Sequence, residues 1–119
     1  MQCGMKSFQL KIKCVFPYKD TPMKFMITWS THTANRHEVF KTFAAMTDAD
    51  DETDHPGVTV IGRWHDVATG TGVAICESDD AAAVQGWGLN WNGTLDIEIR
   101  PVLDDQEARN VIRNRLGTE

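Results

Sequence analysis

The order of strand-like and helix-like segments constrains the fold of this 119-residue chain more than any other feature. Apolar residues at every second position indicate a strand, whereas apolar residues three and four apart indicate a helix. Four strands are predicted, at residues 24–30, 58–66, 73–78 and 95–102. Three helices are predicted: over residues 34–47, between a cap at Asp79 or Asp80 and a stop at Gly93, and after Asp104.

The resulting order is β-α-β-β-α-β followed by a terminal helix, which is the ferredoxin-like order of an α+β protein. In such a fold, two helices cover one face of an antiparallel four-stranded sheet, and the other face meets solvent or a partner. We therefore expect one domain whose sheet has two unlike faces. Residues 48–57, rich in aspartate, are predicted to form a solvated acidic loop.

Residues 1–22 have a different pattern from the rest of the chain. Apolar residues alternate with mostly polar ones up to Pro17, as in a strand. The alternating residues are Phe8, Leu10, Ile12, Cys14 and Phe16. The segment is either an added edge strand or an upstream extension outside the native domain, in which case the domain spans residues 23–119.

Charge and cysteine content exclude several classes of function. The formal net charge is −5, which disfavours phosphate backbones and anionic membranes, so we expect neither a nucleic-acid partner nor a membrane. Three cysteines without a CxxC pair argue against a disulfide framework and a zinc site. With no long apolar run and no hydrophobic leader pattern, the cytoplasm is the expected compartment. We expect no metal and no cofactor.

The two faces of the sheet follow from strand alternation. One set of side chains is assigned to the helix-packed core: Val58, Val60, Trp64, Val73, Ile75, Leu95, Ile97 and Ile99. The second face then holds Arg63, His65, Cys76, Glu98 and Arg100 beside small or apolar neighbours. Such a mixed face suits a partly enclosed pocket between two subunits. The alternative is a solvated face with cross-strand ion pairs, such as Arg63 with Glu98.

Arg63 and His65 are the candidate catalytic residues, because their i, i+2 spacing places both on one face of a strand. A histidine can act as acid or base near neutral pH, and an arginine can hold a carboxylate or an oxyanion. A hydrogen-bonded structural histidine is the alternative for His65. The candidate ligand-binding residues are Trp29 as a pocket wall, His32 at a strand-to-helix junction, Cys76, Glu98 and Arg100, although a buried inert thiol is the default for Cys76.

Several ordered motifs resemble a family of small bacterial proteins, the one catalogued as domain of unknown function 3303. The motifs are residues 23–30, 62–65, 77–80 and 99–102, followed by Asp104 and Asp105. The resemblance covers about residues 23–112. The chain also looks like an outlying member of the dimeric α+β barrel superfamily, which implies a ferredoxin-like protomer and a homodimer with its sheets back to back. The acidic stretch 48–55 departs from the related patterns.

The superfamily resemblance implies several possible functions and does not decide between them. Its members include cofactor-free monooxygenases, stress-response barrel proteins, muconolactone-isomerase-like enzymes and haem-degrading enzymes. The family itself has no assigned activity, so no catalytic residue is carried over. We expect a homodimeric small-molecule-binding protein, with monooxygenase- or isomerase-like chemistry that needs no cofactor as its enzymatic form. The alternative is a non-enzymatic dimeric interaction or structural module.

Overall fold

The computed structural model describes residues 22–117, so both interpretations of residues 1–22 concern a segment outside the described residues, apart from Pro22. The strands are β1 (Met23–Thr31), β2 (Thr59–Asp66), β3 (Thr71–Ser78) and β4 (Leu95–Val102). The helices are the short 3-10 helix η3 (Thr33–Asn35), α1 (Arg36–Ala45), α2 (Asp48–Asp54), α3 (Ala81–Trp91) and α4 (Asp105–Leu116).

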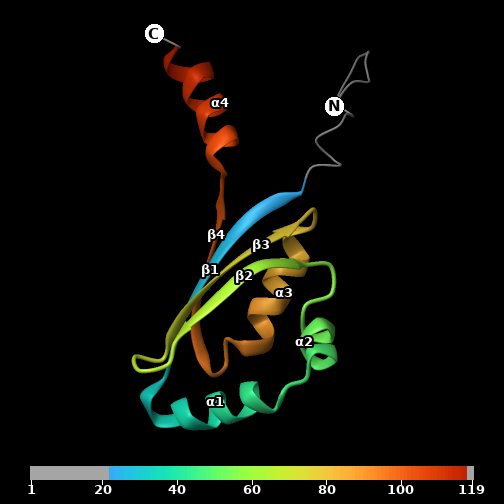
Figure 1. Ribbon diagram of the computed structural model, residues 1–119, viewed down its shortest axis with the longest axis vertical. Coiled ribbons are helices and arrows are strands. Elements are labelled where there is room, and N and C mark those ends of the chain that lie inside the picture. Colours follow the sequence, from blue (N-terminus) through green and yellow to red (C-terminus); the bar gives the residue numbers. More distant parts are fainter. Residues whose placement is uncertain (1–21, 118–119) are drawn as a thin grey trace.

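The four strands form one sheet in the order β2-β3-β1-β4, and each neighbouring pair is antiparallel. With a helix on each β1–β2 and β3–β4 connection, this is the ferredoxin-like arrangement that the segment order predicts (Figure 1). The prediction of an α+β fold with an antiparallel four-stranded sheet and a C-terminal helix is confirmed.

The acidic segment after α1 is a helix, so the prediction of a loop there is wrong. Thr47 caps α2 by accepting a hydrogen bond from the backbone N–H of Asp50, and the Asp50 side chain accepts one from the backbone N–H of Thr47 in return. Acidic side chains in the first turn also interact favourably with the positive end of the helix dipole. A segment rich in aspartate is typical of a solvated loop, but here three aspartates lie in the first turn of a helix, where they stabilise it.

The sheet has a covered face, packed by α3, and an open face. Phe25 and Ile27 lie on the covered face together with Ala74 and Cys76, which are completely buried. The predicted core assignment in β3 is therefore inverted, since Ala74 and Cys76 point to the helices while Val73 and Ile75 point to the open face. The assignment of Leu95, Ile97 and Ile99 to the core is correct.

A β-bulge in β2 changes which side chains of this strand face the helices. Val60 pairs with Cys76 and Gly62 with Ile75, so Ile61 is an extra residue between two paired positions. Beyond the bulge, Arg63 lies on the covered face. Regular alternation along the strand predicts Arg63 and His65 on the opposite face and Trp64 in the core. Trp64 is not in the core, because it is 60% exposed.

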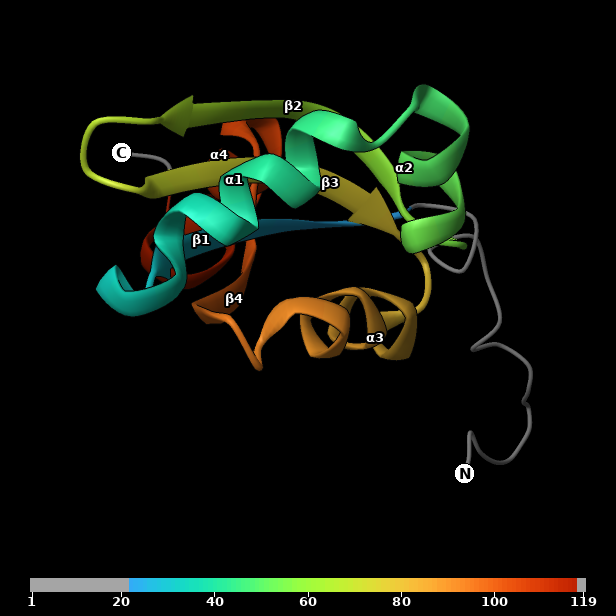
Figure 2. The ribbon, with the colours of Figure 1, turned by 90° about the horizontal axis from the view of Figure 1, so that it is seen from below.

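The helices cover the sheet unevenly. Helix α3 runs along the covered face, whereas α1 crosses the ends of the strands (Figures 1 and 2). No residue of α1 is buried. Helix α4 continues beyond the end of β4 and projects away from the sheet (Figure 1). None of the helices within residues 22–117 has the length and apolarity needed to cross a membrane.

Candidate functional site

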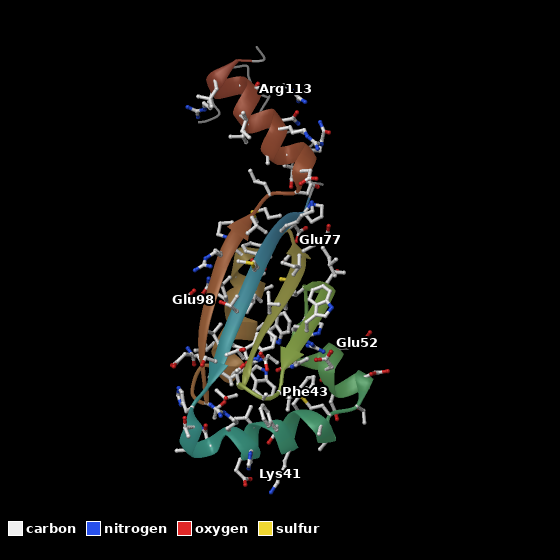
Figure 3. All side chains as sticks on the ribbon, turned by 60° about the vertical axis from the view of Figure 1, so that its left-hand side comes forward. Lys41, Phe43, Glu52, Glu77, Glu98 and Arg113 are labelled. Carbon is white, nitrogen blue, oxygen red and sulfur yellow. The ribbon has the colours of Figure 1, made fainter. Side chains whose placement is uncertain are left out.

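A cavity of about 100 Å³ lies between the covered face of the sheet, α1 and α3. It exists because α1 crosses the strand ends and leaves part of the covered face without a helix. Figure 3 shows Phe43 pointing from α1 toward the sheet, whereas Lys41 points away from it. The wall is mostly aliphatic and aromatic: Ile27, Trp29, Val39, Phe40, Phe43, Trp87, Trp91, Leu95 and Ile97, with Thr31, Asp51, Asp54, Arg63, His65 and Gly88 completing it.

Arg63 is held by α2 rather than by a residue of the sheet. Its Nη1 and Nη2 atoms donate to the two carboxylate oxygens of Asp51 at 3.1 and 2.9 Å, and its guanidinium carbon lies 5.2 Å from the centre of the Phe43 ring. Hydrogen bonding from Arg63 is the main cause that lowers the pKa of the Asp51 carboxyl. The pair therefore presents little net charge to the cavity, and the suggested pair between Arg63 and Glu98 is absent from the described structure.

His65 lies at the exposed rim of the cavity between two aromatic rings. Its imidazole contacts Trp29 edge-on, with ring centres 5.5 Å apart, and Phe43 at 4.9 Å. Burial of the ring lowers the pKa of His65 below its usual 6.5, and the positive charge of Arg63 lowers it further. At neutral pH the imidazole is accordingly uncharged, with one nitrogen able to accept a hydrogen bond or a proton.

Asp54 attaches α2 to α3 at the inner end of the cavity. Its carboxylate accepts hydrogen bonds from Nε1 of Trp87 at 3.0 Å, Nε1 of Trp91 at 2.6 Å and Nδ2 of Asn90 at 3.0 Å. Hydrogen bonds to a charged acceptor are stronger than those between neutral groups. Asp54 thus fixes the orientation of both indole rings in the cavity wall.

His55, the residue that follows α2, is buried against Trp87 of the cavity wall. It is 8% exposed, its Nδ1 atom donates to the carbonyl oxygen of Val58 at 3.1 Å, and its ring centre lies 4.6 Å from that of Trp87. Its buried Nε2 atom has no hydrogen-bond partner among the described residues and lies 3.7 Å from a carboxylate oxygen of Asp51. These contacts connect α2 to the core as well as to Arg63.

The sequence did not identify three residues of the site, because residues 48–57 were assigned to a solvated loop. These residues are Asp51, Asp54 and His55. Their spacing of three and four residues puts all three on one side of a helix. That spacing, together with a capping threonine just before the acidic run, was the available signal.

The other candidate residues are dispersed. Trp29 lies in the cavity wall. His32 donates from Nε2 to Asp96 at 3.0 Å outside the cavity lining. Burial in the core raises the pKa of the Cys76 thiol to about 11, so it is neutral and inert. Glu98 accepts a hydrogen bond from Arg100 at 2.6 Å on the open face, so neither residue shares a face with Arg63 and His65.

The environment of His65 predicts its titration. We expect NMR titration of the imidazole to give a pKa below 6.5, and Arg63→Met to raise it part of the way back by removing the neighbouring positive charge. Since the unfolded chain binds the proton more readily, His65 contributes stability above about pH 6.5 that is lost as the pH falls toward its folded pKa. Arg100→Met, on the opposite face, should leave the midpoint unchanged. A midpoint above 6.5 in the native protein would contradict this placement.

The family model described as "Domain of unknown function (DUF3303)" matches residues 23–116 of this chain. The chain belongs to the DUF3303 family. The match begins with β1 and ends with α4, so the DUF3303 unit contains every described element and all the residues around the cavity. The family assignment made from the sequence motifs is confirmed.

Two further comparisons add little to the DUF3303 assignment. No curated protein matches the chain. A solved structure, titled "Crystal structure analysis of SCO4226 from Streptomyces coelicolor A3(2)", is similar to it at 23% sequence identity, with a TM-score of 0.37. That match covers 66% of this chain and 94% of the other. Within residues 22–117, no group of three or more His, Cys, Asp or Glu side chains is arranged to hold a metal ion.

Proposed function

We propose that this DUF3303 protein is a homodimer that binds a small, mostly apolar molecule in the cavity between α1, α3 and the sheet. The observation that carries the proposal is a cavity of about 100 Å³ with predominantly aromatic and aliphatic walls. The charged groups on its wall already have partners, because Arg63 binds Asp51 while the indole N–H groups bind Asp54. A mostly apolar site whose charged groups already have hydrogen-bond partners within the protein favours a neutral ligand.

The size and the rim of the cavity narrow the class of ligand. An enclosed apolar cavity of roughly 150 Å³ holds a benzene molecule, so this smaller, open cavity suits a single ring or a short branched chain. His65, uncharged at the rim, can accept a hydrogen bond from a hydroxyl or amine on the ligand. We therefore propose a ligand with one apolar ring and one polar hydrogen-bond donor.

The enzymatic form of the proposal assigns His65 as the base in chemistry that needs no cofactor. A neutral imidazole beside an apolar cavity can take a proton from a bound molecule and return it at another atom, as an isomerase requires. A monooxygenase-like reaction would need dioxygen as a second substrate. Arg63, with two N–H groups already bound to Asp51, acts in this proposal by positioning α2 rather than by holding the substrate.

Phenol and toluene test the binding proposal, because they share a ring and differ by one hydrogen-bond donor. We expect phenol to shift the indole N–H signals of Trp87 and Trp91 in NMR spectra of the ¹⁵N-labelled protein. His65→Phe should weaken phenol binding about tenfold, the value of one hydrogen bond, and leave toluene binding unchanged. His37→Phe on the exposed side of α1 is the matched control and should change neither.

Two results would count against the proposal. If neither compound shifts the indole signals at millimolar concentration, the cavity is not a binding site for single-ring molecules. If His65→Phe and His37→Phe weaken phenol binding equally, His65 is not the acceptor.

The non-enzymatic dimeric module is the second candidate, and the open face of the sheet supports it. On this face the edge strand β2 exposes Trp64, which is 60% accessible, and the opposite edge strand β4 carries the charged pair of Glu98 and Arg100. A dimer in sedimentation experiments, combined with no ligand response in the cavity, would favour this second function.

A further inference from the structure

Helix α4 presents an apolar stripe that nothing in the described structure covers. Val111, Ile112 and Leu116 are 48%, 53% and 82% exposed, and no residue of the helix is buried. Their spacing places them on one side of the helix, the arrangement of a surface helix that packs against a core. In Figure 1 the helix projects away from the sheet, beyond the end of β4.

The local sequence stabilises α4 but does not replace packing. Asp104 and Glu107 form a reciprocal capping box, and Arg113 and Arg115 lie in the last turn, where they interact favourably with the helix dipole. Even so, isolated helices shorter than about 12–15 residues are marginal in water, and most helical stability in proteins comes from packing. With 12 residues, α4 is at this limit, so its stripe requires a partner surface.

Lys24 contacts the first turn of α4, where the helix leaves the domain. Its ammonium lies 3.3 Å from a carboxylate oxygen of Asp104, 3.5 Å from one of Glu107 and 3.9 Å from one of Glu77. These contacts join the first turn of α4 to β1 and β3, and from there the helix runs away from its own sheet (Figure 1).

The open face of the sheet is the complementary surface. Figure 3 looks onto this face, and no helix of residues 22–117 crosses in front of the strands. Its centre is formed by Met26, Thr28, Val73 and Ile75. Strands of eight residues rising about 3.3 Å per residue, spaced about 4.8 Å apart, give it an extent of roughly 26 by 19 Å. A helix of 12 residues is about 18 Å long and about 10 Å wide, so one α4 can cover the apolar centre of this face.

Charges on the two surfaces are also complementary. The last three turns of α4 carry Arg109, Arg113 and Arg115. The edge strand β4 presents Asp96, Glu98 and Arg100 on the open face. Glu98 already pairs with Arg100 at 2.6 Å, whereas Asp96 accepts a hydrogen bond from His32 and stays 80% exposed, so it remains accessible to an arginine. Arginines flanking an apolar stripe can meet carboxylates flanking an apolar sheet, which favours one orientation of the helix on the strand.

From these observations we propose that α4 is an exchanged arm: each copy of the chain packs its α4 on the open sheet face of a second copy. The proposal rests on the homodimer of the proposed function and names the element that closes it. The contact is reciprocal under a two-fold axis, so each open face receives one α4 and both apolar stripes are covered at once. Arg109 and Arg113 of one copy then lie near β4 of the other.

Disulfide trapping between two differently labelled chains tests the contact directly. One chain carries Val111→Cys and the other Thr28→Cys, and Cys3 and Cys14 are replaced by serine in both. We expect mild oxidation of the mixture to give a covalent dimer containing one chain of each kind. The same mixture with Asn114→Cys, on the polar side of α4, in place of Val111→Cys should give none.

Sedimentation velocity separates the arm from the homodimer itself. We expect the unaltered protein to be a dimer, Ile112→Glu to weaken the dimer more than tenfold, and the matched variant Asn114→Glu to leave it unchanged. Circular dichroism should show the same sheet signal in all three proteins, since α4 buries no residue in its own domain.

Three other outcomes would overturn the exchanged arm, the homodimer or both. A wild-type dimer that Ile112→Glu weakens no more than Asn114→Glu overturns the arm and leaves the homodimer standing. Weakening by Ile112→Glu without the mixed covalent dimer also overturns the arm, because α4 then acts away from the open face. A wild-type monomer at all concentrations overturns both proposals.

Discussion

Replacing Asp54 with alanine is expected to lower the free energy of unfolding by about 3 kcal/mol. Two indole N–H groups lose their acceptor, while the Asn90 amide keeps the backbone carbonyl of residue 54. The N–H of Trp87, a residue that is 9% exposed, is then buried without a partner. An unsatisfied buried polar group costs about 1–3 kcal/mol. Urea unfolding followed by circular dichroism would measure the change.

Glu52→Ala is the matched control for Asp54→Ala, because it removes an exposed carboxylate from the same helix. It should change stability by less than about 0.5 kcal/mol, as surface substitutions usually do. Equal effects of the two variants would show that Asp54 stabilises α2 only through its charge. That result would remove the anchoring of the cavity wall described above.

Gly72→Ala is expected to cost about 2 kcal/mol, since overpacking a core forces neighbours out of their positions. A Cβ atom at residue 72 would overlap Cζ2 and Cε2 of Trp29, which lies across this glycine on the covered face. Displacing the Trp29 ring also removes the edge contact with His65. We therefore expect lower stability in urea together with weaker phenol binding.

Gly86→Ala is the control, and we expect it to raise stability where Gly72→Ala lowers it. Nothing lies within 4 Å of a Cβ atom at this position on α3. Alanine in a helix is more stable than glycine by about 0.5–1 kcal/mol, so the variant should gain stability. A loss of stability in Gly86→Ala equal to that in Gly72→Ala would indicate a general sensitivity to glycine replacement rather than the overlap with Trp29.

The fold could be predicted from the sequence because its signals are local. Strand and helix periods, the caps at Asp80 and Asp104, and the order of the segments need no knowledge of which residues meet in space. The family motifs indicated the DUF3303 family over about residues 23–112, and the family model matches residues 23–116.

The arrangement of the site was less predictable, because it depends on one extra residue. Alternation gives the correct faces for β4, but the bulge at Ile61 reverses the assignment of Arg63 and His65. In β3 the small residues Ala74 and Cys76 face the helices, where α3 packs closely, and the larger Val73 and Ile75 face outward. The assignment of Val73 and Ile75 to the core is therefore wrong.

The weak attachment of α1 determines how a molecule could enter and leave the cavity. Helix α1 buries no residue, and its N-cap residue, Asn35, makes no side-chain capping hydrogen bond. Segments with few buried contacts open at a free energy far below that of global unfolding. A ligand can therefore exchange through a local displacement of α1 while the sheet and α3 stay intact. Its residence time would then be set by the opening rate of this helix as much as by its affinity for the aromatic wall.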